Sequence, residues 1–274
     1  MLPTKGLIGA GAGSRLQAGG ALLAVAALGW SASSFAQVHF NEKYYQFRST
    51  CGLPGNMYGV NNDGDIGFAG AMSECIPVGY TPSNSSWAAG VVWAQSIKGE
   101  FHLGVSGHGI DDTATACFGV GSKGHGVALI WTGVDQIPGK VVSIQGQPIS
   151  ETRKRPAVSV GVLDIIRERD PVRDLPPRVK GDRSFYIAAT KRLGGPHNPV
   201  HATVGFGTAR FNNGPFFGVC WDVRRRIKLI GEYDGYKWNA AIAGDLLGTR
   251  EHSLVLFLGA EWLNRPVIGV TYAH

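Results

Sequence analysis

The amino-acid sequence predicts an all-β protein, an up-and-down antiparallel transmembrane β-barrel of about 12 strands that follows a cleaved signal peptide. Three observations lead to this fold class. Short segments alternate between apolar and polar residues, tight turns separate many of them, and glycine and aromatic residues are plentiful. The chain has 40 Gly in 274 residues, roughly twice the usual share of about 7%. Charged residues make up 17%, against about 25% in ordinary soluble domains, which favours a barrel wall.

The alternation is clearest at residues 227–234 and 253–262. In the first segment the odd positions carry Ile, Leu, Gly and Tyr, whereas the even positions carry Lys, Ile, Glu and Asp. Successive side chains of a strand point to opposite faces, so one face is apolar and the other is largely ionic. In the second segment three Leu, an Ala and a Trp share a face. Both segments therefore read as two-faced strands of a meander.

Residues 1–36 are typical of an export signal. Lys5 and Arg15 precede an apolar stretch at residues 18–30, and small residues stand before a cleavage position after Ala36. The stretch is shorter than the about 20 residues that a membrane-spanning helix needs. We therefore expect cleavage, with a retained anchor as the alternative. The predicted domains are a signal peptide (1–36), an N-terminal lead-in segment (37–62) and the β-barrel (63–274).

An exported chain reaches an oxidising compartment, where disulfides form. Cys51 and Cys75 flank a turn-rich segment and are the best-placed pair for a disulfide. Cys117 and Cys220 lie in strand-like runs, where a buried thiol is an equal alternative. The chain has no C-x-x-C motif, so zinc or redox chemistry has no support from the cysteines.

Candidate strands follow one another from about residue 66, with a hairpin expected at residues 96–99. Bacterial single-chain barrels usually have an even number of strands, so about 12 is the expected count. The candidates are residues 66–73, 87–95, 100–108, 113–120, 126–131, 157–165, 184–191, 201–211, 216–223, 227–234, 239–246, 253–262 and 266–274.

Residues 167–182 (RERDPVRDLPPRVKGD) form the longest insert without strand character. They carry three prolines and charges of both signs, which is typical of a surface loop. If the chain ends in the periplasm, counting hairpins back places this loop outside the cell and residues 224–226 at a periplasmic turn. Long outer loops and short inner turns are usual in such barrels.

The second face of the strands separates a membrane barrel from a soluble sandwich. A lipid-facing barrel has an apolar outside and a polar lumen, whereas a soluble protein has the reverse. Here the second face is mostly Gly, Ala, Ser and Thr with isolated charges, and several aromatics stand near strand ends. A soluble periplasmic β protein is the alternative. The candidate lumen-lining residues are Asp222, Lys228, Glu232, Asp234, Asp245 and Glu261.

The last strand and the distribution of charge indicate the partners of the chain. Residues 267–274, with Gly269 and Tyr272, are similar to the terminal strand signal that the barrel-assembly machinery recognises, although His274 replaces the usual Phe. The net charge of +6 is concentrated around residues 153–155 and 167–183, which indicates solvated loops rather than a nucleic-acid surface. The expected location is the outer membrane of a Gram-negative-type cell, with outer-membrane lipid as a partner and no nucleic acid.

Three motifs carry a family resemblance: residues 205–211 (GFGTARF), residues 229–235 (LIGEYDG) followed by Asn239-Ala240, and residues 265–272 (RPVIGVTY). With these, the chain resembles the YjbH-like outer-membrane proteins, mainly over residues 200–274. The resemblance implies a non-enzymatic barrel associated with exopolysaccharide production or export, as a scaffold or a narrow pore. It also implies polysaccharide or envelope proteins as partners.

Catalytic interpretations have weaker support, and we predict no catalytic residue, no cofactor and no metal site. A hydrolase or lipid-modifying enzyme using Ser106 (with His108 and Asp111) or the His102/His108 group is one alternative, although Ser106 lacks the G-x-S-x-G elbow. A carboxylate pair at Glu232 and Asp234 suggests a glycosidase, but a lumen salt network with Lys228, or a solvated pair, is the favoured interpretation. A structural or adhesive envelope protein is the third function considered.

Overall fold

The structure is a computed structural model that describes residues 52–95, 110–134, 139–166, 183–195, 197–249, 252–263 and 265–274. The predicted signal peptide (1–36), Cys51 and the predicted loop 167–182 lie outside these residues. None of the helical segments in the described ranges is long and apolar enough to cross a membrane.

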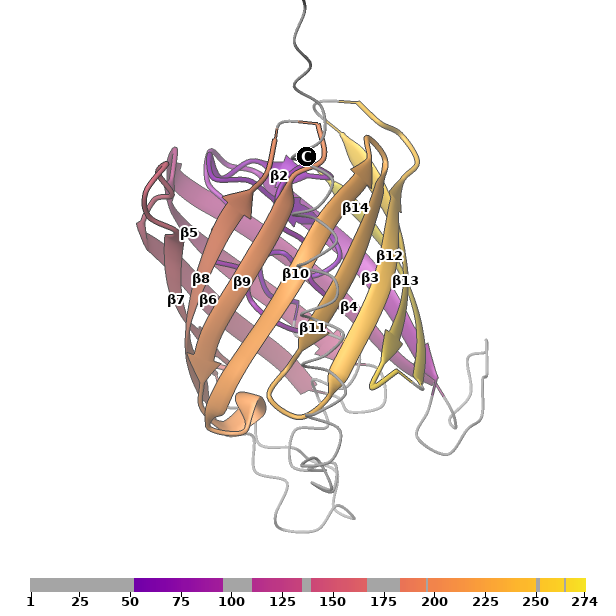
Figure 1. Cartoon of the computed structure of the whole chain (residues 1–274). Helices are drawn as coiled ribbons and strands as arrows, with labels where there is room; N and C mark the ends of the chain where they lie inside the picture. Colours follow the sequence, from indigo (N-terminus) through magenta and orange to yellow (C-terminus); the bar gives the residue numbers. More distant parts are fainter. Residues whose placement is uncertain are drawn as a thin grey trace, which may run out of the picture. The chain divides into compact units, whose positions relative to one another are not determined.

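Twelve antiparallel strands form a closed barrel (Figure 1), which confirms the predicted fold class and strand number. Neighbours in sequence are neighbours in the barrel, and the last strand pairs with the first, with Val270 opposite Val91. The strands, here called the wall, are β3 (Trp87–Gln95), β4 (Ile110–Ser122), β5 (His125–Val134), β6 (Gly139–Ile149), β7 (Ala157–Leu163), β8 (Ser184–Leu193), β9 (Val200–Gly207), β10 (Gly214–Arg224), β11 (Ile227–Tyr233), β12 (Trp238–Asp245), β13 (Ser253–Glu261) and β14 (Arg265–Ala273).

The wall is apolar outside and polar inside. In β11 the side chains of Lys228 and Glu232 are fully buried, whereas Ile227 and Leu229 are exposed by 36% and 40%. The same pattern recurs around the barrel, and this inversion is what a lipid-facing barrel requires. Exposed apolar side chains of the outer surface include Val91, Phe118, Leu129, Val160, Phe185, Ile187, Val204, Phe206, Ile242 and Leu258.

Aromatic side chains gather at both ends of the wall. At the end that holds the C-terminus, the Trp87 ring lies 5.5 Å from the Tyr272 ring. At the other end, Tyr233 and Trp238 sit across the β11–β12 hairpin with ring centroids 5.7 Å apart, and Phe217 of β10 packs on both. Rings at both ends of an apolar band are typical of membrane interfaces.

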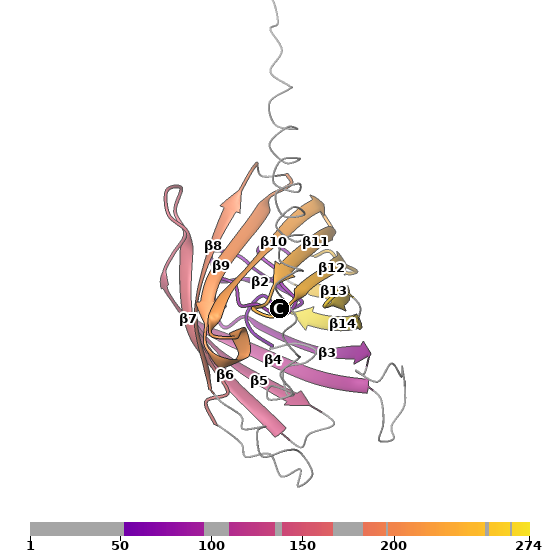
Figure 2. The same cartoon turned by 60° about the horizontal axis from the view of Figure 1, so that its bottom comes forward.

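Residues 52–86 lie inside the barrel and are here called the plug (Figure 2). The plug has two short strands of its own, β1 (Gly59–Val60) and β2 (Ile66–Gly67), which pair with each other and not with the wall. The expected barrel strand at residues 66–73 is therefore wrong, and the wall begins at Trp87 rather than at residue 63.

Two further differences concern the wall. β3 agrees with the predicted strand 87–95, but Gln95 pairs with Ile110 and Trp87 with Phe118. The strand beside β3 therefore begins at Ile110, and the expected hairpin at 96–99 and returning strand at 100–108 lie outside the described residues. The sequence also missed β6, because its inward side chains are polar, as at Gln145 and Gln147, and its pairing with β7 is irregular between Gly146 and Ile149.

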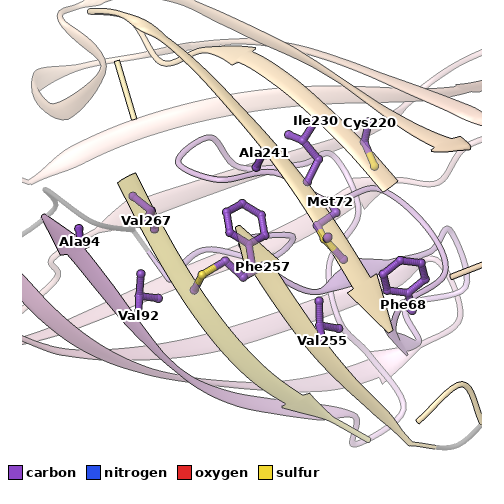
Figure 3. Close-up of a cluster of buried hydrophobic side chains, with 12 residues drawn as sticks. Phe68, Met72, Val92, Ala94, Cys220, Ile230, Ala241, Val255, Phe257 and Val267 are labelled. Atoms are coloured by element: carbon purple, nitrogen blue, oxygen red, sulfur yellow. The ribbon is translucent and has the colours of Figure 1, made fainter. Parts of the chain in front are cut away.

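The core of the protein is the contact between plug and wall. Figure 3 shows Phe68 and Met72 of the plug among wall side chains such as Val255 and Phe257. Glycine lets the plug approach the wall at Gly126, where a Cβ would lie 2.8 Å from Thr81 O and closer still to Pro82 O. Burial of these apolar side chains favours a filled lumen.

Candidate functional site

The wall binds the plug through polar side chains, and the first of them is Glu232. This residue points inward from β11 and is fully buried. Its Oε2 accepts the backbone N–H of Glu74 at 2.9 Å, and its Oε1 accepts the N–H of Cys75 at 2.7 Å. Asn239 Nδ2 donates to Oε1 at 3.2 Å. One wall carboxylate thus satisfies two consecutive backbone donors of the plug, which are strong hydrogen bonds because the acceptor can ionise.

Four carboxylates meet at this point, and we call Glu74, Glu232, Asp234 and Glu261 the carboxylate cluster. All four are buried. Two guanidinium groups face them. Arg265 Nη1 lies 2.7 Å from Glu261 Oε2, and Arg210 Nη2 lies 3.6 Å from Asp234 Oδ2.

Burial raises the pKa of Glu74 well above its ordinary value, and the charges of Glu261, Glu232 and Asp234 raise it further, while Arg265 opposes them. Burial and the Glu261 and Glu232 charges also raise the pKa of the Cys75 thiol. Cys75 is a free thiol whose sulfur donates to Glu261 Oε1 at 3.7 Å. The expected Cys51–Cys75 disulfide is therefore not present, because the thiol packs into the carboxylate cluster instead.

Lys228 binds the plug on another part of β11. Its side chain is fully buried, and Nζ donates to Gly70 O at 2.9 Å and to Asp222 Oδ1. The ammonium also lies 5.1 Å from the centre of the Phe68 ring, a cation–π contact. A buried charge needs such partners, and the plug supplies two of the three.

A third group of contacts comes from β6, β7 and β8. Gln145 Nε2 donates to Tyr80 O at 2.9 Å, and Gln147 Oε1 accepts the N–H of Thr81 at 2.7 Å. Ser159 Oγ donates to Val78 O at 2.9 Å, and Thr190 Oγ1 accepts the N–H of Gly79 at 2.7 Å. These wall side chains satisfy buried backbone groups of the plug that have no sheet partner. Local sequence patterns carry no signal for these contacts, because the partners lie 65 to 111 residues apart in the chain.

Five of the six candidate lumen-lining residues form two groups that touch the plug. Glu232, Asp234 and Glu261 belong to the carboxylate cluster, and Lys228 pairs with Asp222, whose side chain is 19% exposed. Asp245 is buried at the end of β12, where it accepts the N–H of Leu247 at 3.3 Å in its own turn. Glu74, the plug member of the cluster, was not predicted from the sequence.

The residues of the hydrolase alternative, Ser106, His102 and His108, lie outside the described residues. His125 does lie 3.1 Å from Ser150 Oγ, but that hydroxyl donates to Gly124 O at 2.7 Å. Its proton is thus engaged elsewhere, unlike that of an activated nucleophile. Glu232 is covered by the plug, so a glycosidase role would lack access to a sugar.

No protein-family model matches the sequence, and no curated protein matches it either. Among solved structures, the chain is similar in fold to the COG4313 outer membrane channel from Pseudomonas putida F1. The two share 11% sequence identity with a TM-score of 0.37, and the match covers 73% of this chain and 96% of the channel. The assignment of the fold rests on the strand pairing and the apolar outer surface described above.

Proposed function

We propose that this chain is a non-enzymatic outer-membrane β-barrel, closed at rest by its own plug, that acts as a scaffold in exopolysaccharide production or export. The observation that carries the proposal is the plug, which hydrogen-bonds to β6, β7, β8, β11 and β13 and so fills the lumen from several sides. A barrel of twelve strands is wider than the eight-stranded barrels that side chains alone can fill, and here the plug occupies the lumen. A plugged barrel therefore offers its rims and loops, rather than a passage, to its partners.

The link to exopolysaccharide comes from the resemblance at residues 205–211, 229–235 and 265–272. In the structure these residues lie in β9 and the η2 turn (Ala209–Phe211), in β11 and in β14. Asp234, Gly235 and Arg210 of these motifs meet at one rim, where Gly235 approaches the Phe211 backbone. The motifs thus shape the rim beside the buried carboxylate cluster, and this rim is the surface that we propose for docking.

A narrow pore is the second candidate, and the polar inner wall favours it. If the plug moved, a row of small hydroxyl side chains would face the lumen and would be readily hydrated, as in porins. These buried side chains include Thr113, Thr115, Thr132, Ser159, Thr190, Thr203 and Thr271.

A reversible lock on the plug separates the two functions. A Cβ on Gly67 would lie 3.4 Å from Ser253 Oγ, which is near the geometry of a disulfide. We would delete the gene in its host, measure secreted exopolysaccharide, and complement with the wild type, with the double variant Gly67→Cys/Ser253→Cys, and with each single variant as a control.

Under the scaffold function, deletion lowers secreted polymer and the locked double variant restores it fully. Under the pore function, the locked variant restores it only after a reductant opens the disulfide. Unchanged polymer in the deletion strain would contradict both, and would direct attention to an adhesive role of the loops.

A further inference from the structure

Three potential metal ligands lie together on the inner wall where β9 and β10 pair. His201 of β9 is directly opposite Cys220 of β10, and Asp222 follows two residues later on the same face. One ligand atom from each of the three residues lies within 4.8 Å of the others. We propose that His201, Cys220 and Asp222 bind a divalent transition-metal ion of the zinc class, and we call them the three-ligand site.

The donor set suits such an ion. An imidazole nitrogen, a thiolate and a carboxylate are the ligands that Zn²⁺ takes in proteins, with bonds of about 2.0–2.3 Å. Hard ions such as Mg²⁺ or Ca²⁺ prefer oxygen alone, so the thiol selects against them. A thiolate and a carboxylate together neutralise a dication, which makes the bound ion acceptable in a buried place.

His201 supplies an independent observation. Its side chain is 4% exposed, and within the described residues its buried Nδ1 has no hydrogen-bond partner. A buried polar nitrogen without a partner is unfavourable and calls for an explanation. Its ring is fixed at the edge of the Tyr80 ring, with centroids 6.2 Å apart. A metal bond would satisfy Nδ1, for which the part of the chain that the structure describes offers no partner.

Asp222 has one oxygen to spare for the ion. Its Oδ1 accepts the Lys228 ammonium, which leaves the second carboxylate oxygen for a metal. Hydrogen-bonded carboxylate ligands are usual in metal sites, because the outer partner fixes the ligand's orientation. Lys228 would act as that partner. The other nearby cation, Arg192, stands opposite His201 but is exposed to solvent at the end of β8, where its charge is screened.

The three-ligand site touches both solvent and plug. Asp222 is near the β10–β11 turn and its side chain is 19% exposed, so an ion can arrive from that rim. On the lumen side, Met72 of the plug and Cys220 belong to one buried cluster, and Lys228 donates to Gly70 O. A bound ion would therefore stiffen the part of the wall to which the plug is attached.

Metal titration of the folded full-length protein in detergent tests the proposal. After treatment with a chelator, Zn²⁺ binding is measured by calorimetry and Co²⁺ binding by absorption, where a thiolate ligand gives a charge-transfer band. We expect one tight equivalent per chain. Cys220→Ser should remove the Co²⁺ band, and Cys220→Ser, His201→Gln and Asp222→Asn should each weaken binding about tenfold or more.

Cys117→Ser is the matched control, since Cys117 is also a buried free thiol of the wall. It should leave stoichiometry, affinity and band unchanged. Heat-modifiable migration on a gel checks that each variant keeps a closed barrel. The proposal is overturned if the wild type binds no equivalent of Zn²⁺, if Cys220→Ser retains the band and the affinity, or if Cys117→Ser loses them.

Discussion

Glu232 of the wall binds Glu74 of the plug through the backbone, with Oε2 of Glu232 accepting the Glu74 N–H at 2.9 Å. The two carboxyl groups belong to one buried cluster with Glu261 and Asp234, so the docking of the plug is linked to protonation. A cluster of four acids with two facing arginines carries excess negative charge when all the acids are ionised. The state of the cluster therefore decides how firmly the plug is held.

We predict that the docked plug is more stable in acid than in base. The pKa of Glu74 is raised in the folded state, by burial first and then by Glu261, Glu232 and Asp234. The folded state therefore binds more protons than the unfolded state between the ordinary glutamate pKa of about 4.3 and the raised value, so stability falls as pH rises through that interval. Hydrogen exchange of plug amides should be faster at about pH 8 than at about pH 5, beyond the intrinsic pH effect.

Glu74→Gln should weaken this pH dependence, since an amide keeps the shape but does not ionise. The control is Asp63→Asn, which removes an exposed plug carboxylate paired with Lys123 and should leave the dependence intact. Equal pH profiles for wild type and Glu74→Gln would contradict the assignment.

Lys228→Met should loosen the plug near Gly70. The substitution keeps the stem of the side chain but removes the donor to Gly70 O and the partner of Asp222. Loss of a buried hydrogen-bond partner costs about 1–3 kcal/mol, measured as a lower midpoint of heat-induced unfolding. Lys123→Met, at an exposed ion pair, is the control and should not change the midpoint. A stable Lys228→Met barrel with slow exchange at residues 69–72 would refute this role.

Gly126→Val should displace the plug from β5. Any Cβ at this position meets the carbonyl oxygens of Thr81 and Pro82, so wall and plug cannot both keep their places. Faster exchange around residues 81–83 is the expected result. Gly231→Val provides the comparison, because a Cβ there meets nothing within 4 Å. The same exchange in both variants would argue against close plug contact at Gly126.

A charged substitution on the outer surface should destabilise the barrel more, the deeper its position lies in the bilayer. Val204 is 60% exposed on the outer face of β9, and an arginine there should destabilise the bilayer-inserted barrel by about 2–4 kcal/mol. Leu193 is 48% exposed at the end of β8, and an arginine there should cost about 0–1 kcal/mol. Unfolding from lipid vesicles by denaturant measures both. Similar, small effects at the two positions would contradict a membrane-facing surface.

Alternation alone was enough to predict most of the wall. Segments such as Ile227–Tyr233 have one face for lipid and one for the lumen, so their pattern is strong and local. β6 was not predicted, because its inward Gln145 and Gln147 form hydrogen bonds to the plug and are not part of an apolar core.

The plug itself could not be predicted from local pattern. Residues 66–73 alternate like a strand, but their partners are side chains such as Ser253 and Lys228, far away in the sequence. For the same reason, the sequence predicted only the wall members of the carboxylate cluster. Strand alternation places Glu232, Asp234 and Glu261 on the inner face of the wall. Glu74 joins them only because the plug folds inside the barrel, which no local pattern indicates.

Electrical conductance in a planar lipid bilayer tests the central claim, a lumen closed by residues 52–86, most directly. We predict no steady conductance from the wild type or from oxidised Gly67→Cys/Ser253→Cys, and steady open pores from a variant that lacks residues 52–86 and still shows heat-modifiable migration. Steady conductance of the wild type that persists in the locked variant would show that the plug does not close the barrel.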